Sequence, residues 1–490
     1  MKKVDAVVIG AGPGGYVCAI RLAQYGKKVV LIEKHKLGGE CLNYGCIPSK
    51  SLIFASSLFE KVTEGKKFGV EADNVRFNMA SLQKWRENLV KKLNQGISFL
   101  LKQNKVEVLE GEAQFTSPTT IKVDKEEIEA VHFVIATGSQ SLHIPGFEFD
   151  GKTVLSSKEA LELSKLPHKI LILGGGVIGL ELGMYFSKLG VEIEVVEMMP
   201  QILPGTDKDL VHVLEKNLKK RKIEIHTSTK AKSLKIDSRL RGNDKGDRGN
   251  DKGDRGNDKG DRGNDEQWKG VTLTVEKDGK EVKLEGDILL VTIGRKAVTE
   301  SLQLDKALIE TDAKGFILVN PHLQTSSSHI YAIGDVTGGP LLAHKASFQG
   351  IQVANTIGRG APTQPRPVSW AIFTDPEIAG VGLNEAQAVE QGHEAQVGKF
   401  PFAALGRASA VGETEGFVKI VSDKNTEVVL GVFIVGTHAS DLISEGTLAV
   451  THKLKLEDIA STIHPHPTLP EALMEASEAA LGHAIHITNH

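Results

Sequence analysis

The sequence predicts an α/β protein that contains two doubly wound, parallel-sheet domains. One order of segments occurs twice: a short apolar strand, a glycine-rich turn, an amphipathic helix and a second apolar strand that ends in glutamate. The first copy runs from Val4 to Glu33 and the second from Lys169 to Glu197. The length of 490 residues also indicates several domains, because single hydrophobic cores stop growing at about 250–300 residues.

The composition narrows the class of protein. Hydrophobic residues make up 40% of the chain and charged residues 25%, which is near the average for globular proteins. The net charge of −3 comes from 59 basic and 62 acidic residues without a sustained basic stripe, so nucleic acid is not an expected partner. No stretch approaches the roughly 20 apolar residues that span a bilayer, so no membrane contact is expected.

Cysteine usage and the N-terminal residues indicate the compartment. The three cysteines, Cys18, Cys41 and Cys46, are too few for the disulfide framework of a secreted protein. The apolar run after Lys3 enters a glycine loop too soon to be the apolar stretch of a signal peptide. We therefore expect a soluble protein in a reducing, cytoplasmic location.

The first glycine-rich turn has the spacing of a dinucleotide site. Gly10, Gly12 and Gly15 give the Gly-x-Gly-x-x-Gly pattern between a strand and a helix. The first glycine permits a tight turn, the second lets the backbone approach a pyrophosphate, and the third allows close helix–strand packing. Glu33, 23 residues after Gly10, is placed to accept hydrogen bonds from an adenosine ribose. A glycine-rich turn without a ligand is the alternative.

The second turn repeats this design. It contains Gly174, Gly176 and Gly179, and Glu197 again follows the first glycine by 23 residues. The residues after Glu197 are Met-Met-Pro, with no arginine to take a 2′-phosphate. NAD is therefore favoured over NADP, which stays open as the alternative.

Two cysteines lie close together directly after the first unit. Cys41 and Cys46 are five residues apart, and Pro48 suits the first turn of a helix, so Cys46 is expected near a helix N-terminus. The helix dipole there favours a thiolate that can face an electron acceptor. A structural zinc site needs four ligands, whereas only Cys18 and His35 are nearby, so no metal is expected. Two unconnected buried thiols remain an alternative, and Cys18 is more simply a core residue.

A repeat interrupts the second unit between Ser238 and Glu266. The heptapeptide Arg-Gly-Asn-Asp-Lys-Gly-Asp begins at Arg241 and recurs, and its frequent glycines and lack of apolar residues exclude a coiled coil. The flanks, 230–236 and 271–275, alternate like antiparallel strands, so we interpret the repeat as a disordered lengthening of a hairpin loop. Both an inert expansion and a binding tail are compatible with it.

The order of these motifs resembles the pyridine nucleotide-disulfide oxidoreductase family over nearly the whole chain. The resemblance rests on a Cys-x-x-x-x-Cys pair between two dinucleotide motifs, with Ala136-Thr137-Gly138 and Gly334-Asp335 as two further short motifs. It implies that FAD occupies the first site, in contact with Ala136, Thr137, Gly138 and Asp335, and that NAD occupies the second. It also implies that Cys41 and Cys46 form a redox-active disulfide.

The resemblance implies four domains. These are an FAD-binding domain with the cysteine pair at 1–148, an NAD-binding domain at 149–295 with the repeat insertion at 238–266, a central domain that completes the FAD site at 296–362, and a C-terminal domain at 363–490. The expected fold class is thus α/β, with two Rossmann-like FAD/NAD(P)-binding domains and a C-terminal α+β dimerisation domain that makes a homodimer.

Within the family, two segments are similar to the members that oxidise dihydrolipoamide. They are the segment from Cys41 to Lys50 and the C-terminal His464-Pro465-His466-Pro467-Thr468-Leu469-Pro470-Glu471. This resemblance implies that His466 is the acid-base, that Glu471 orients it, and that both reach the active site of the partner subunit. Spacing alone does not distinguish His466 from His464, and a proline-rich loop with unengaged histidines is the alternative.

Further roles follow from the same resemblance. Lys50 is expected near the flavin and paired with Glu181, Ala343 is expected as another FAD contact, and Gly294 as another NAD contact. One departure from the family pattern is Gln349-Gly350, where Glu-Gly is usual, and a slight change in hydrogen bonding on the flavin side is expected from it.

The implied function is oxidation of protein-bound dihydrolipoamide to lipoamide, with electrons passing from the cysteine pair through FAD to NAD⁺. The implied partners are the lipoyl domains and acyltransferase core of 2-oxoacid dehydrogenase complexes. One alternative is a glutathione or mercuric reductase that uses NADPH; the lack of an arginine after Glu197 and of a C-terminal cysteine pair speaks against it. The other is a structural flavoprotein subunit that docks through the repeat.

Overall fold

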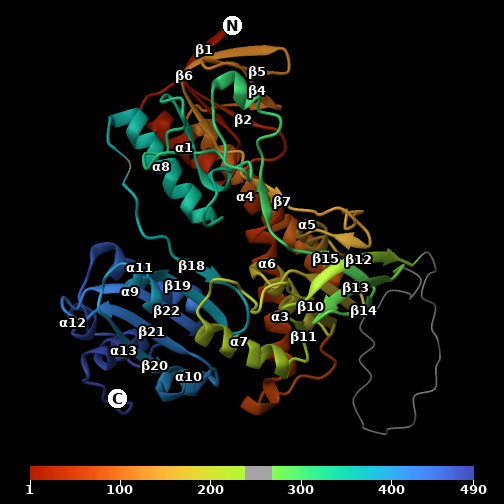
Figure 1. Ribbon diagram of the computed structural model, residues 1–490, viewed down its shortest axis with the longest axis vertical. Helices are drawn as coiled ribbons and strands as arrows, with labels where there is room; N and C mark the ends of the chain where they lie inside the picture. The colour runs from red at the N-terminus through yellow and green to blue at the C-terminus, as the bar shows by residue number, and fades with distance from the viewer. Residues whose placement is uncertain (238–267, 363, 490) are drawn as a thin grey trace. The chain divides into compact units, whose positions relative to one another are not determined.

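The computed structural model describes residues 1–237, 268–362 and 364–489 (Figure 1). The chain forms two compact units, Met1–Gly174 with Ala231–Pro365, and Gly175–Lys230 with Arg366–His490. The expected repeat insertion at 238–266 lies outside the described residues, and the division into four domains stays a prediction. Among the described residues, no helix combines the length and apolar character needed to cross a membrane.

The largest sheet of the first unit is mixed (Figure 1). Its strands follow the order β3-β2-β1-β6-β5-β4, and β17 pairs with β6. The pairs β1–β2, β1–β6 and β17–β6 are parallel, as the first repeated motif predicts, whereas β4, β5 and β6 are antiparallel. The strands are β1 Lys2–Ile9, β2 Val29–Glu33, β3 Glu107–Glu110, β4 Ala113–Ser117, β5 Thr120–Val123, β6 Glu126–Ile135 and β17 Ile330–Ala332.

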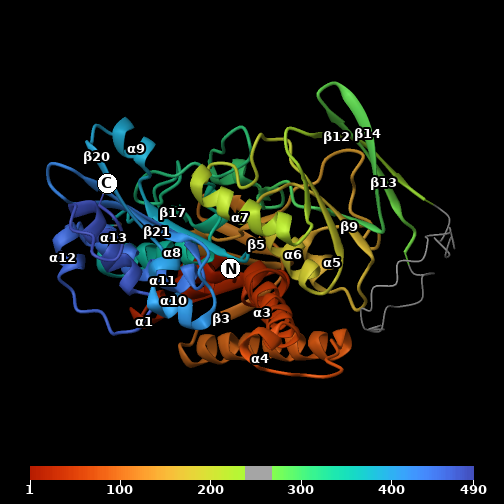
Figure 2. The same cartoon turned by 90° about the horizontal axis from the view of Figure 1, so that it is seen from below.

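Both faces of this sheet are apolar. Val7 packs into one core and Val8 into the other, and Cys18 is fully buried beside Val8, as expected for a core residue. Helices α1 and α8 pack closely together (Figure 1). This approach requires glycine at position 350, because a Cβ there would lie 2.5 Å from the carbonyl oxygen of Gly14. Helices α3 and α4 also lie side by side (Figure 2). The helices are α1 Pro13–Gln24, α2 Gly39–Tyr44, α3 Cys46–Thr63, α4 Met79–Gln103, α5 Ser157–Leu161 and α8 Ala343–Arg359.

Three smaller groups of strands complete the first unit. β15 pairs in parallel with β9 and with β8, β7 pairs antiparallel with β16, and β12, β13 and β14 form a three-stranded sheet. The strands are β7 Ser139–Ser141, β8 Val154–Leu155, β9 Lys169–Leu173, β12 Lys230–Ile236, β13 Val271–Lys277, β14 Lys280–Gly286, β15 Ile288–Val291 and β16 Arg295–Ala297.

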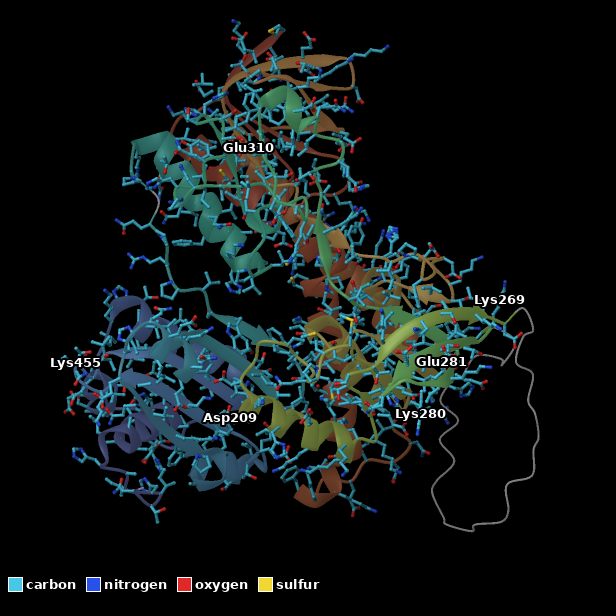
Figure 3. All side chains as sticks on the ribbon, in the orientation of Figure 1. Asp209, Lys269, Lys280, Glu281, Glu310 and Lys455 are labelled. Atoms are coloured by element: carbon cyan, nitrogen blue, oxygen red, sulfur yellow. The ribbon has the colours of Figure 1, made fainter. Side chains whose placement is uncertain are left out.

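The flanks of the repeat are neighbouring strands, which confirms the prediction from their alternating pattern. The backbone N–H of Asp237, just after β12, donates to the carbonyl oxygen of Gly270, just before β13 (3.0 Å). β13 then turns directly into β14, where Figure 3 labels Lys280 and Glu281. The repeat therefore connects two paired strands.

The second unit contains part of the second dinucleotide motif and the C-terminal segment. β10 Glu192–Val196 and β11 Glu224–His226 are parallel, with helices α6 Val177–Lys188 and α7 Lys208–Lys220. The C-terminal sheet is antiparallel and has the order β18-β19-β22-β21-β20. Helices α11, α12 and α13 pack on it through one apolar core, so the expected C-terminal α+β domain is confirmed. Its elements are β18 Trp370–Ile372, β19 Glu377–Gly382, α9 Glu385–Glu390, β20 Ala395–Pro401, α10 Gly406–Val411, β21 Phe417–Asp423, β22 Val429–Gly436, α11 Ala439–His452, α12 Leu456–Ala460 and α13 Glu471–Leu481.

Lys419 joins the two parts of the second unit. Its buried Nζ lies 2.7 Å from Asp207 and 3.0 Å from Asp209, at the start of α7 (Figure 3 labels Asp209). Burial alone would raise the pKa of Asp209, but the hydrogen bond and charge of Lys419, together with Lys399, lower it. The start of α7 is therefore tied to β21 by an ion-pair network.

Candidate active site

The first glycine-rich turn is tight where the sequence predicts. Gly10 has φ +98°, and a Cβ there would lie 2.4 Å from the carbonyl oxygen of Ala136. A Cβ on Gly15 would lie 1.8 Å from the carbonyl oxygen of Gly10, so the helix can approach the strand only if this residue is glycine. Gly12, by contrast, has nothing within 4 Å of its Cβ position among the described residues. This opening over the backbone suits a pyrophosphate.

Glu33 holds this turn in place. Its Oε2 accepts a hydrogen bond from the N–H of Ala11 (2.7 Å) and its Oε1 from the N–H of His35 (2.9 Å). Gly12 is the N-cap residue of α1, and among the described residues no side chain accepts a hydrogen bond from the first N–H groups of the helix. The uncapped N–H groups and the positive end of the helix dipole are the chemistry that binds a phosphate. The residues therefore fit a dinucleotide at this turn.

The second glycine-rich turn has the same backbone and hydrogen-bond features as the first. Gly174 has φ +106°, and Gly176 again has an open Cβ position among the described residues. Glu197 Oε2 accepts from the N–H of Gly175 and its Oε1 from the N–H of Met199, both at 2.7 Å. The equal spacing in the sequence thus corresponds to equal hydrogen bonding at the two turns. Gly179 lies buried in α6, and Gly294 has φ +133° and an open Cβ position.

The further motifs that the resemblance assigns to FAD gather beside the first turn. The N–H of Ala136 donates to the carbonyl oxygen of Ile9 (2.8 Å), so the Ala136-Thr137-Gly138 segment continues β6 past the end of β1. Thr137 Oγ1 donates to the carbonyl oxygen of Val298 (2.6 Å). Gly138 has φ +73° and an open Cβ position.

Asp335 lies in the turn that follows β17. Its Oδ2 accepts a hydrogen bond from Ser139 Oγ (2.6 Å). The N–H of Gly334 donates to Gln349 Oε1 (2.7 Å), so the residue that departs from the family pattern bonds directly beside Asp335 through a neutral amide. Ala343 is the first residue of α8, a helix with no side-chain cap among the described residues.

The two cysteines are brought together by a break between two helices. Cys41 lies in α2, Gly45 ends that helix, and Cys46 is the first residue of α3, so the expected position at a helix N-terminus is confirmed. Pro48 lies in the first turn of α3. The Cys41 and Cys46 side chains are within hydrogen-bonding reach of each other as thiols.

The surroundings of Cys41 raise the pKa of its thiol. The hydrogen bond with Cys46 raises the pKa of the Cys41 thiol most, burial raises it further, and the positive charge of Lys50 opposes both effects. Burial and, to a smaller extent, the charge of Cys41 raise the pKa of Tyr16, which places this α1 tyrosine near the pair.

Glu181 lies in the second unit, on α6. Its side chain is buried, and Oε1 accepts a hydrogen bond from the N–H of Phe373 (2.9 Å). Lys50 belongs to the first unit, so the expected pairing of Lys50 with Glu181 stays a prediction.

The structure separates the two C-terminal histidines, which spacing alone did not. His466 Nδ1 lies 2.8 Å from Glu471 Oε1, while its side chain is 78% exposed. His464 is only 5% exposed, and its two ring nitrogens lie 2.8 Å from the carbonyl oxygen of Thr462 and 2.9 Å from Glu445 Oε1. His466 thus has one nitrogen oriented and the rest of its ring accessible, whereas both nitrogens of His464 are engaged.

Glu471 is well placed to orient His466. Its side chain is 15% exposed, and Oε2 accepts a hydrogen bond from the N–H of Thr468 (2.6 Å). Burial would raise the pKa of Glu471, but the Thr468 N–H and His466 together lower it. The carboxylate is therefore held in its charged form.

Three residues at the site escaped the sequence reasoning. Tyr16, Ser139 and Arg295 belong to no motif with a fixed chemical role, although Ser139 and Arg295 directly follow Gly138 and Gly294. The Arg295 side chain contacts both Ser139 and Glu40. Only the pairing of β7 with β16 reveals this arrangement, because 155 residues of chain separate their first residues.

These features define a dinucleotide-dependent oxidoreductase with two neighbouring cysteines. The chain belongs to the pyridine nucleotide-disulphide oxidoreductase family, whose model matches residues 4–350, and it carries that family's dimerisation domain at residues 368–477.

Named relatives match the chain over its length. Dihydrolipoyl dehydrogenase from Thermus scotoductus is 42% identical, with 100% of both chains covered. The enzyme of the same name from Bacillus subtilis is 41% identical and covers 99% of this chain and 98% of its own.

Solved structures of other proteins have a similar fold. LpdA from Mycobacterium tuberculosis has a TM-score of 0.85 at 26% identity, with 98% of this chain and 99% of that one covered. The Cu(II) complex of the HOCl-induced flavoprotein disulfide reductase RclA from Escherichia coli has a TM-score of 0.81 at 25% identity and the same coverage. The expected fold class is therefore confirmed.

Proposed function

We propose that this chain is a dihydrolipoyl dehydrogenase, which oxidises protein-bound dihydrolipoamide to lipoamide and reduces NAD⁺ to NADH. The observation that carries the proposal is the Cys41–Cys46 pair at the head of α3, in a chain with two matched dinucleotide turns. Full-length relatives at 40–42% identity bear the same name, which supports the substrate class.

The cofactors are FAD and NAD. We propose that FAD is held at Gly10, Gly12 and Gly15 with Glu33, and by Lys50, Ala136, Thr137, Gly138, Asp335 and Ala343. We propose that NAD is held at Gly174, Gly176 and Gly179 with Glu197 and Gly294. When bound, FAD supplies two-electron chemistry between the cysteine pair and NAD⁺.

The chain's own residues carry out the thiol–disulfide exchange. His466 takes a proton from the first substrate thiol, and the resulting thiolate attacks Sγ of Cys41 in the oxidised pair. The Cys41–Cys46 bond breaks, and Cys46 leaves as a thiolate at the N-terminus of α3, where the dipole favours negative charge. The second substrate sulfur then attacks the first, Cys41 leaves with the remaining proton, and lipoamide is released. Two electrons have passed from the substrate to the cysteine pair.

The accessibility of the histidines supports His466 as the acid-base. His466 keeps Nε2 available for a substrate because only Nδ1 contacts Glu471. We propose that His466 and Glu471 serve the cysteine pair of the partner subunit in a homodimer, and that Lys50 pairs with Glu181. We further propose a cytoplasmic enzyme whose partners are the lipoyl domains and acyltransferase core of 2-oxoacid dehydrogenase complexes.

The test is reduction of NAD⁺ by dihydrolipoamide with the purified, FAD-loaded protein, beside NADP⁺ under the same conditions. Rapid reduction of NAD⁺ alone is expected. Cys46→Ser should abolish turnover and leave FAD bound, whereas the matched control Cys18→Ser changes a core thiol and should leave turnover intact. Turnover retained by Cys46→Ser would refute the exchange scheme, and an inactive FAD-loaded wild type would refute the substrate.

A further inference from the structure

We propose that Arg295 is a positioning residue that fixes the cysteine helix α2 and the flavin-side carboxylate Asp335 relative to each other. The inference rests on the proposed function, in which electrons pass between these two places. Sequence reasoning placed Arg295 at the end of the NAD-binding domain, but the described contacts of its side chain lie with the FAD-site residues of the first unit.

Arg295 reaches the Asp335 side through Ser139. Strand β16 pairs with β7, which places the guanidinium along Ser139: Nε donates to Ser139 Oγ (2.7 Å) and Nη2 to the Ser139 carbonyl oxygen (2.8 Å). Ser139 Oγ in turn donates to Asp335 Oδ2 (2.6 Å). Because Oγ accepts from the guanidinium, its single proton is directed to the carboxylate. The chain of bonds has a charge at each end, which strengthens both bonds.

The nitrogen that donates to the Ser139 carbonyl oxygen also reaches the cysteine helix. Arg295 Nη2 lies 3.2 Å from Glu40 Oε1, and Glu40 directly precedes Cys41 in α2. The Arg295 side chain is 13% exposed, whereas Glu40 is 42% exposed. The contact with Ser139 is therefore the stronger of the two, because solvent screens the contact with Glu40. One fixed, planar group thus spans both elements.

This geometry predicts different effects on FAD affinity and on the thiolate–flavin absorbance when the Ser139 contact or the Glu40 contact is removed. Ser139→Ala leaves Asp335 without its oriented donor and should weaken the binding of FAD to the apoprotein by roughly tenfold. Glu40→Gln should leave FAD binding within about threefold, because its contact is screened, but should lower the long-wavelength absorbance of a thiolate beside oxidised flavin. Arg295→Met should lower both the FAD affinity and the long-wavelength absorbance. Arg295→Lys should rescue only part, because an ammonium cannot reproduce the fork of donors.

The experiment measures the dissociation constant of FAD from the apoprotein and the thiolate–flavin absorbance, with apoprotein melting as a check on folding. Arg86→Met is the matched control, because Arg86 is a buried arginine that bonds Gln83 in α4. In a double-mutant cycle, Ser139→Ala should add little to Arg295→Met. Full additivity, or unchanged FAD affinity and absorbance in Arg295→Met, would overturn the inference.

The outcomes separate this inference from the proposed function. A wild type that fails to oxidise dihydrolipoamide, with FAD affinity still lost in Arg295→Met, refutes the substrate and supports the positioning role. An active wild type whose Arg295→Met variant keeps FAD affinity and absorbance refutes the positioning role alone.

Discussion

Glu471→Gln is expected to disable His466 while leaving its position almost unchanged. The carboxylate accepts from the Thr468 N–H (2.6 Å) and contacts His466 Nδ1 (2.8 Å). Glutamine can satisfy Thr468 only with its amide oxygen, so its NH₂ group must face Nδ1. Nδ1 then has to accept a hydrogen bond, and the imidazole proton moves to Nε2. Nε2 is the atom that has to take the substrate proton.

The expected loss is that of general-base catalysis, about 10²–10⁴-fold in kcat. At about 1.36 kcal/mol per tenfold, this equals roughly 2.7–5.4 kcal/mol in the barrier. The assay is steady-state reduction of NAD⁺ by dihydrolipoamide, with the KM for NAD⁺ expected to stay unchanged.

Glu445→Gln is the matched control, because Glu445 contacts the buried His464 (2.9 Å). It should affect stability more than turnover. A Glu471→Gln variant that keeps more than about a tenth of the wild-type kcat would refute the tautomer argument.

Three further predictions follow from the glycine turns and the ion pairs. Gly12→Ala should weaken FAD retention without loss of fold, since its Cβ projects into open space, whereas Gly15→Ala should impair folding because its Cβ would meet the Gly10 carbonyl oxygen at 1.8 Å; FAD titration and thermal melting distinguish the two. Lys419→Met should destabilise the second unit by about 1–3 kcal/mol in urea unfolding, because Asp207 and Asp209 lose their buried partner while Asp209 keeps Lys399. The pKa of Glu471 is lowered in the folded state, so its stabilising contribution is present above the unfolded carboxyl pKa of about 4.3 and is lost as the pH falls through the folded value. Glu471→Gln should therefore reduce the loss of unfolding free energy at acidic pH, measured by urea unfolding across that range.

Much of the site could be predicted because its parts are local. Gly10, Gly12 and Gly15 act within one turn, and Cys46 gains its position from the helix that begins there. Such features depend on short-range steric and helix-dipole effects that a few adjacent residues determine.

The remaining parts of the site depend on contacts between distant segments. Arg295 meets Ser139 only because β16 pairs with β7. His464 and His466 differ in exposure and contact carboxylates on different helices, Glu445 on α11 and Glu471 on α13. No spacing rule states which histidine will be buried, because burial is decided by the packing of these helices.

The hydrogen bonds of Glu33 and Glu197 have a consequence for how cofactors bind. Each carboxylate accepts one backbone N–H from its glycine-rich turn and one from the residue two positions after itself, so the turn is fixed to the end of the second strand by the chain's own bonds. Preorganisation of this kind lowers the entropic cost of ordering a loop on association. Removing either carboxylate should therefore slow cofactor capture and make it dependent on loop closure, even where every direct contact to the phosphates is kept.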